Sequence, residues 1–193
     1  MTNNRYPALD ENNLTPDQQR VYDAIASGPR GGVRGPLRVW LQSPQLAQRA
    51  QALGQFARYD SSLDPVLSEL AILVTARIWG SGYEWGAHAP IAKKAGLDGQ
   101  VIAAIASASR PVFDNPAQSA VFEFAVDLHR DRRVADTTYA CALDLLGTAG
   151  VVDLVGICGY YTLISMTINV FDVPRDGMET LPALDIPPED MFR

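Results

Sequence analysis

The stretch DPVLSELAILVTARIWGSGYEWGAH, residues 64–88, decides how the chain folds. It opens with Asp64 and Pro65, a pair typical of a helix start. The residues that follow are apolar at helical spacing on nearly every face, so we expect this helix to lie at the centre of the domain. Glu69 interrupts the apolar run, and it needs a partner because a buried unpaired carboxylate is costly.

The second part of the stretch, residues 81–88, contains one of only two histidines in the protein. If this segment is helical, Glu84 and His88 share a face, because residues i and i+4 are neighbours on a helix. A carboxylate beside an imidazole is suited to acid–base chemistry near neutral pH. A purely structural interpretation also exists, since Ser81 and Glu84 form the Ser-x-x-Glu pattern of a helix capping box.

Helices also dominate the rest of the chain, where alternating strand patterns are nearly absent. Start and stop signals predict further helices at residues 15–27, 43–59, 98–109, 115–130, 136–147 and 150–173, besides those that begin at 64 and 81. Residues 28–36 hold four glycines and two prolines and are predicted to form a loop. The acidic, proline-rich tail, residues 182–193, is expected to be extended or mobile. We therefore predict an all-α single domain over residues 1–193, with about eight helices.

The composition excludes several functions. The formal net charge is −6 and the basic residues are scattered, so no basic surface is available for nucleic acid. Residues 151–171 have the length of a membrane span, but they contain Asp153 and several hydroxyl side chains, so we interpret them as a central helix or a subunit-interface helix. The first residues lack the apolar segment of a signal peptide, and a cytoplasmic protein is expected.

Three further side chains receive structural interpretations. Cys141 and Cys158 are isolated thiols in apolar segments without a Cys-x-x-Cys pair, and we expect both to be buried and reduced. His129 lies beside Arg130 and Asp131 at a predicted helix end, where we expect a position on the surface.

Residues 67–77, 81–88 and 95–97 together resemble the carboxymuconolactone decarboxylase family, which includes the alkylhydroperoxidase-D-like proteins. The resemblance covers about residues 60–110. It implies an alkylhydroperoxidase-D-like helical bundle that assembles into homotrimers or homohexamers, with sites near the subunit interfaces.

The two branches of this family differ at the centre of the motif. The peroxidase branch has Glu followed by Cys-x-x-Cys-x-x-x-His, and this pattern falls on Glu69 and His88 with Ser81 and Glu84 at the cysteine positions. A hydroxyl and a carboxylate cannot form the thiolate and disulfide of peroxide reduction, so thiol peroxidase activity is not expected. The decarboxylase branch resembles His-Glu-Leu-x-x-His, of which this chain keeps Glu84 and His88 but has Tyr83 in place of the first histidine.

The resemblance implies a lyase that needs no cofactor and no metal and acts by proton transfer on a small carboxylated lactone or a related acid of aromatic catabolism. His88 is expected to donate the proton, with Glu84 and Glu69 as its catalytic partners. Arg34 and Arg38, in and just after the glycine-rich loop, are expected to hold the substrate carboxylate.

Three more residues near the motif are expected to contact the substrate, namely Tyr83, Trp85 and Ser81. Each of the principal assignments has an alternative. Glu69 could form a structural ion pair with Arg77. The two glutamates and His88 could instead hold a metal ion.

Two alternative functions also follow from the resemblance. One is an alkylhydroperoxidase-type protein whose thiol peroxidase activity is lost or altered. The other is a non-catalytic oligomer that binds a small molecule, because a fold by itself does not establish a reaction.

Overall fold

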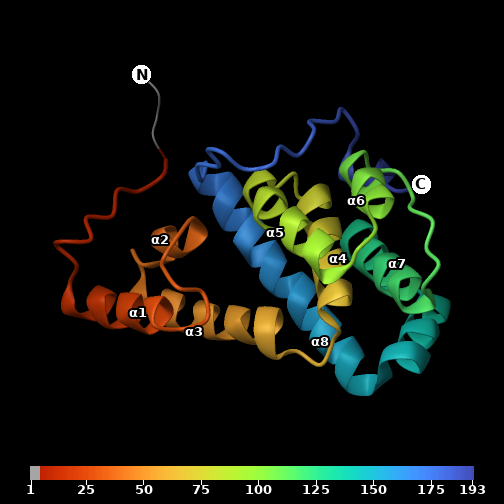
Figure 1. Ribbon diagram of the computed structural model, residues 1–193, viewed down its shortest axis with the longest axis horizontal. Helices are drawn as coiled ribbons and strands as arrows, with labels where there is room; N and C mark the ends of the chain where they lie inside the picture. The colour runs from red at the N-terminus through yellow and green to blue at the C-terminus, as the bar shows by residue number, and fades with distance from the viewer. Residues whose placement is uncertain (1–4) are drawn as a thin grey trace.

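The computed structural model describes residues 5–193, which form helices and no strands (Figure 1). In this part of the chain the α-helices are α1 (Pro16–Ala26), α2 (Pro36–Trp40), α3 (Pro44–Gln55), α4 (Pro65–Ile78), α5 (Gly82–Ala95), α6 (Gly99–Ala106), α7 (Pro116–Arg130) and α8 (Asp136–Phe171). A π-helix, η1 (Phe56–Asp60), follows α3, and a 3-10 turn, η2 (Pro188–Asp190), lies near the C-terminus. The predicted all-α fold is confirmed, although α2 was not predicted.

Helix α4 is the centre of the fold, as its apolar sequence predicts. Every residue from Leu67 to Ile78 is buried, and α4 packs against α5, α7 and α8. Its N-terminus is capped by Asp64, whose side chain accepts a hydrogen bond from the backbone N–H of Val66 at 3.0 Å. Because α4 is buried on all sides, any polar group that it carries must find a partner inside the protein.

The predicted helices 136–147 and 150–173 form one helix, α8, with a break at the predicted place. Gly147 has φ +69° and ψ 173° inside the helix, a conformation that glycine adopts readily because it has no Cβ. The ribbon changes direction there, between the teal start of α8 and its long blue part (Figure 1). An 18-residue window of α8 is apolar enough to cross a membrane, but a core helix passes the same test.

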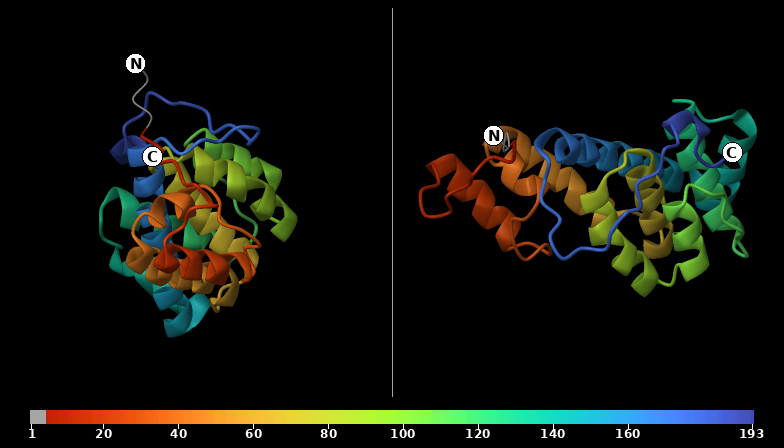
Figure 2. Two further views of the ribbon diagram at one scale, coloured as in Figure 1. Left: turned by 90° about the vertical axis from the view of Figure 1, so that its left-hand side faces the viewer. Right: turned by 90° about the horizontal axis from the view of Figure 1, so that it is seen from above.

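The N-terminal helices α1, α2 and α3 lie at one end of the molecule, and α7 lies at the other end with the C-terminus (Figure 2). Helix α2 is tied to α8 because the indole N–H of Trp40 donates to Thr167 at 2.9 Å. The π-helix η1 extends α3 and contacts both α4 and α8. The N-terminal helices and η1 thereby form a wall beside α8.

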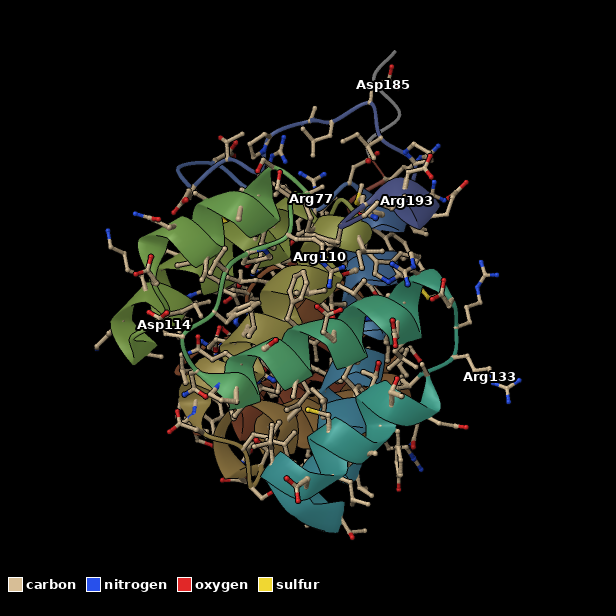
Figure 3. All side chains as sticks on the ribbon, turned by 90° about the vertical axis from the view of Figure 1, so that its right-hand side faces the viewer. Arg77, Arg110, Asp114, Arg133, Asp185 and Arg193 are labelled. Atoms are coloured by element: carbon tan, nitrogen blue, oxygen red, sulfur yellow. The ribbon has the colours of Figure 1, made fainter. Side chains whose placement is uncertain are left out.

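The C-terminal segment that follows α8, residues 172–193, contains the predicted extended tail and is anchored along its length. Arg77 of α4 donates to the carbonyl oxygen of Pro182 at 2.7 Å. Arg110 donates to the carbonyl oxygen of Phe192 at 2.8 Å, and the Phe192 ring is fully buried against Phe122. Figure 3 shows Arg77 and Arg110 on the side of the molecule where the last residues lie.

Candidate active site

Helices α4 and α5 bring Glu69, Glu84 and His88 together. Oε2 of Glu69 lies 2.7 Å from Nδ1 of His88, and Oε2 of Glu84 lies 3.3 Å from Nε2 of the same ring. The three side chains are almost completely buried, with residue exposures of 3–4%. The helical spacing correctly placed Glu84 beside His88, and Glu69 is the buried carboxylate of α4 that needed a partner.

The environment of His88 favours its charged form. Burial by itself would lower the pKa of the imidazole, but the charge of Glu69 and the hydrogen bonds to Glu69 and Glu84 raise it to about 9. Both ring nitrogens face carboxylate oxygens, which is the arrangement that suits an imidazolium with two N–H donors. At neutral pH the group therefore holds a proton ready for transfer.

The structural alternatives for these residues are not realised. The side chain of Ser81 makes no capping hydrogen bond, and its buried hydroxyl has no partner among the described residues. Arg77 does not pair with Glu69, because its guanidinium donates to the carbonyl oxygens of Ala106 and Pro182. Glu69 is therefore committed to His88.

A cavity of about 350 Å³ opens onto Glu84 and His88. Its wall is formed by the loop before α2, by η1, by α5 and α8, and by Met178 of the C-terminal segment. Glu69 does not line the cavity, so it lies behind His88 and is not directly accessible to a ligand. Glu84 and His88 are the acid–base groups that a ligand can reach.

Arginines supply the positive charge of the cavity. Arg34 lines it, as predicted, together with Arg30 and Arg58. Arg38 does not line it, because its guanidinium pairs with Glu11 and donates to the carbonyl oxygen of Leu9 at 2.9 Å. The prediction that Arg38 contacts the substrate therefore finds no support in this arrangement.

Two arginines of the cavity, Arg30 and Arg58, were not predicted, and only Arg30 lies in a segment that the sequence marks as part of the site. Arg30 lies in the same glycine-rich loop as Arg34, and its Nη2 donates to the Tyr160 hydroxyl at 3.2 Å while its buried Nε has no partner among the described residues. Arg58 lies in η1 and stacks over the ring of Tyr59 at 5.1 Å. A π-helix is rare and leaves no clear sequence signal, so this position could not be predicted.

Of the predicted contact residues near the motif, only Tyr83 lines the cavity. It packs closely on Gly35, which has φ +53°, and a Cβ at that glycine would lie 2.2 Å from the Tyr83 hydroxyl. Ser81 is fully buried and does not reach the cavity. Trp85 points to the other side of α5.

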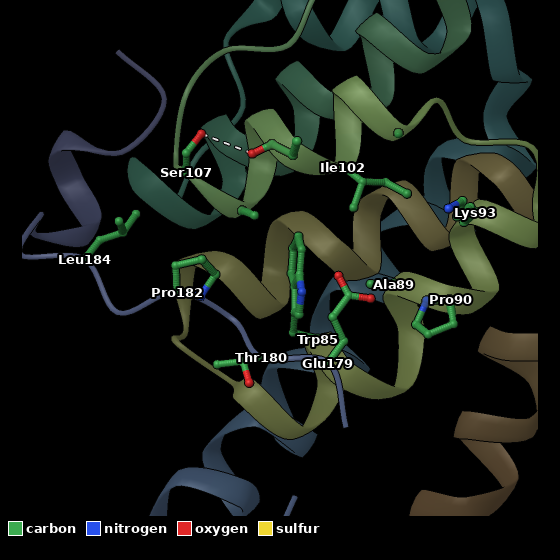
Figure 4. Close-up of a pocket in the computed structure, with 13 residues that line it drawn as sticks. Trp85, Ala89, Pro90, Lys93, Ile102, Ser107, Glu179, Thr180, Pro182 and Leu184 are labelled. Atoms are coloured by element: carbon green, nitrogen blue, oxygen red, sulfur yellow. Dashed lines mark hydrogen bonds between the residues drawn. The ribbon is translucent and has the colours of Figure 1, made fainter. Parts of the chain in front are cut away.

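Trp85 lies in a separate groove of about 670 Å³ between α5, α6 and the C-terminal segment. Figure 4 shows its indole among Glu179 and Pro182 of the C-terminal segment and Ile102 of α6. The groove is on the face of α5 that carries Ala89, whereas His88 faces the smaller cavity. Trp85 therefore does not share a pocket with the acid–base groups.

The predictions for His129 and Cys141 are wrong. His129 is partly buried, and its Nε2 lies 2.9 Å from the hydroxyl of Thr75, which itself donates to the carbonyl oxygen of Ala71. His129 must therefore donate through Nε2, and burial lowers the pKa of its imidazole to about 4. Cys141 is exposed, whereas Cys158 is buried as predicted, and both thiols are free.

Metal-ligating side chains are not clustered in the described part of the chain. No group of three or more His, Cys, Asp or Glu side chains in residues 5–193 is arranged to hold a metal ion. In the Glu69–His88–Glu84 group, each ring nitrogen lies at hydrogen-bonding distance from a carboxylate oxygen.

Comparison with known proteins finds a family match and a protein of similar fold. Residues 44–127 match the model of the carboxymuconolactone decarboxylase family. The crystal structure of an uncharacterized peroxidase-related protein from Silicibacter sp. TM1040 is similar in fold, with a TM-score of 0.70 and 14% sequence identity over 89% of this chain and 90% of that chain. A search of curated proteins finds no match. The matched segment contains Glu69, Glu84 and His88 and is similar to the carboxymuconolactone decarboxylase family, and the helical fold is alkylhydroperoxidase-D-like.

Proposed function

We propose that this protein is a cofactor-free lyase that removes a carboxyl group from a small carboxylated lactone, or a related acid, by proton transfer. The observation that carries the proposal is the Glu69–His88–Glu84 group, because a charged imidazole between two carboxylates at a cavity wall is a source of protons. The family match over residues 44–127 supports the same class of chemistry.

The charges of the cavity support an anionic substrate. Arg30, Arg34 and Arg58 come from the loop before α2 and from η1, and all three line the cavity that Glu84 and His88 reach. A guanidinium binds a carboxylate through two parallel hydrogen bonds, which fixes the orientation of the bound acid. The cavity of about 350 Å³ suits a molecule of the size of a substituted lactone.

The proposed reaction has two steps and needs no oxidant or reductant. In the first step, the bond between the substrate carbon and its carboxyl group breaks, carbon dioxide leaves, and the electron pair passes into the conjugated carbonyl group to give an enolate. In the second step, the enolate carbon takes a proton from His88, and His88 regains a proton from solvent. The substrate thus loses carbon dioxide and gains one proton.

The cysteines support the absence of thiol peroxidase chemistry. Neither thiol lines the cavity: Cys141 is exposed at the start of α8, and burial raises the pKa of the Cys158 thiol to about 12. A thiol with so high a pKa is a poor nucleophile at neutral pH. The positions of the family's two cysteines hold the buried hydroxyl of Ser81 and the carboxylate of Glu84.

The proposal is tested with 4-carboxymuconolactone and related carboxylated lactones as substrates. Release of carbon dioxide is measured together with the NMR spectrum of the product in D₂O, in which the product is expected to carry one deuterium at the newly protonated carbon. His88→Gln is expected to lower kcat/KM by on the order of 10²- to 10⁴-fold. His129→Gln is the matched control and is expected to keep full activity.

Two results would overturn this function. One is turnover by His88→Gln within about a factor of two of the wild-type rate, since a positioned acid contributes far more than that. The other is tight binding of the lactones without release of carbon dioxide, which would support a binding protein instead.

A further inference from the structure

Tyr161 of α8 is a buried phenol beside the acid–base group. It is 2% exposed, its ring meets the His88 ring edge to face at a centroid distance of 5.0 Å and an angle of 86°, and it lines the cavity. No hydrogen bond to its hydroxyl is formed by the residues that the structure describes. Most buried polar groups have such a partner, so an unpaired phenol at a cavity wall is suited to bind a ligand.

The neighbouring tyrosines are engaged or placed differently. The hydroxyl of Tyr160 accepts a hydrogen bond from Arg30 at 3.2 Å. Tyr59 is 42% exposed, and Tyr83 packs on Gly35. Among the tyrosines that line the cavity, Tyr161 is the one whose ring meets the His88 ring edge to face.

The surroundings keep the phenol of Tyr161 neutral. Burial, together with the nearby charges of Glu84 and Glu69, raises its pKa well above 10. Its O–H group is therefore retained at every pH at which the protein is expected to work. A neutral donor that packing holds in place can stabilise a developing negative charge, because its dipole is already oriented before the reaction.

We infer that the hydroxyl of Tyr161 donates a hydrogen bond to the oxyanion of a bound enolate, while the arginines hold a carboxylate that the substrate retains and His88 supplies the proton to carbon. This inference rests on the proposed function. It assigns to Tyr161 the stabilisation of the intermediate that carbon dioxide leaves behind. Two different groups then act on the two ends of the enolate, Tyr161 on its oxygen and His88 on its carbon.

A carboxylated nitrophenol, 5-hydroxy-2-nitrobenzoate, tests the inference without any turnover. Its carboxylate mimics that of the substrate, and its coloured phenolate mimics the enolate oxygen. Bound to the wild-type protein, the probe is expected to ionise at a lower pH than in solution, because Tyr161 stabilises the phenolate. Tyr161→Phe keeps the ring and the edge-to-face contact and is expected to reduce the preference for phenolate about tenfold or more.

The matched control is Tyr139→Phe, which removes the same hydroxyl from an exposed position that does not line the cavity. It is expected to leave the ionisation of the bound probe unchanged. The inference is overturned if Tyr161→Phe binds phenolate with the wild-type preference, or if the wild-type protein shows no preference for phenolate. Thermal unfolding of both variants verifies that the fold is intact.

Turnover separates this inference from the proposed function. With 4-carboxymuconolactone, Tyr161→Phe is expected to lower kcat on the order of 10²-fold while KM changes little. If the wild-type protein turns over the lactone and Tyr161→Phe does so with an undiminished kcat, the role of Tyr161 is overturned and the lyase function stands. Phenolate binding that depends on Tyr161, without turnover of any carboxylated lactone, supports the oxyanion site and overturns the lyase.

Discussion

Replacing His88 is expected to remove one contribution to the pH dependence of the free energy of unfolding. The folded-state pKa of His88 is raised from 6.5 to about 9, which at about 1.4 kcal/mol per pKa unit corresponds to about 3 kcal/mol. Because the folded pKa lies above the unfolded one, this contribution is fully present below about pH 6.5 and is lost as the pH rises through about 9. His88→Gln has no such group to titrate.

The assay is urea unfolding of the wild-type protein and of His88→Gln at several pH values between about 6 and about 10. The free energy of unfolding of the variant is subtracted from that of the wild type at each pH, so that the titration of other groups cancels. The difference is expected to shrink by about 3 kcal/mol across this range. His129→Gln is the control, and its difference from wild type should be flat above about pH 7, because burial lowers the pKa of His129 to about 4. A constant difference between wild type and His88→Gln would refute the charged imidazole.

Three further substitutions test the cavity, the C-terminal segment and the assembly. Arg34→Gln is expected to raise KM for a carboxylated lactone on the order of 10- to 100-fold. Arg38 lies outside the cavity, so Arg38→Gln is expected to leave KM unchanged. Equal effects of the two substitutions on KM would contradict the assignment of the cavity as the substrate site. Gly86→Ala is expected to lower the free energy of unfolding by about 1–3 kcal/mol, because its methyl group would lie 2.6 Å from the Cβ of Met178 in the C-terminal segment. Gly99→Ala is the matched control, because its methyl group meets nothing within 4 Å. Equal urea midpoints for the two variants would contradict the close packing at Gly86. Val152→Asp, on the exposed apolar face of α8, is expected to break a homotrimer or homohexamer into monomers in sedimentation velocity, and a monomeric wild-type protein would contradict the expected assembly.

The central helix and the pairing of its carboxylate could be predicted from the sequence because both depend on local rules. The long apolar run around Glu69 follows a helix-start pair, which favours a buried helix, and a buried carboxylate needs a partner. Glu84 and His88 are four residues apart on one helix, so their contact follows from helical geometry alone. The contact between Glu69 and the His88 ring depends on how α4 packs on α5. Residue spacing could not predict this contact, and the family resemblance indicated it.

The rest of the cavity could not be predicted, because it depends on elements far apart in the sequence. Arg58 points into the cavity from a π-helix, and Tyr161 reaches it from α8, about seventy residues after His88. Trp85 was assigned to the site because it lies inside the motif, yet one position on a helix turns a side chain by about 100° and directs it into a different groove. Sequence proximity to a motif is therefore weaker evidence than the helix face.

The burial of His129 and Cys141 was also predicted wrongly, because it depends on how the helices pack. His129 was expected at the surface because charged residues follow it, but α7 turns its imidazole towards Thr75 of α4. Cys141 was expected in the interior because of its apolar neighbours, but it lies on the exposed side of the short part of α8 before Gly147. In both cases the packing between helices, and not the local composition, decides the burial.

The most direct test of the acid–base group is an NMR titration of protein labelled with ¹⁵N-histidine. Only two histidines are present, and their environments shift their pKa values in opposite directions, so the two signals identify themselves. At about pH 7, His88 is expected to be protonated on both nitrogens and to titrate near 9, whereas His129 is expected to be neutral with its proton on Nε2. A His88 that is neutral at that pH and titrates at or below 6.5 would contradict the proton-transfer site.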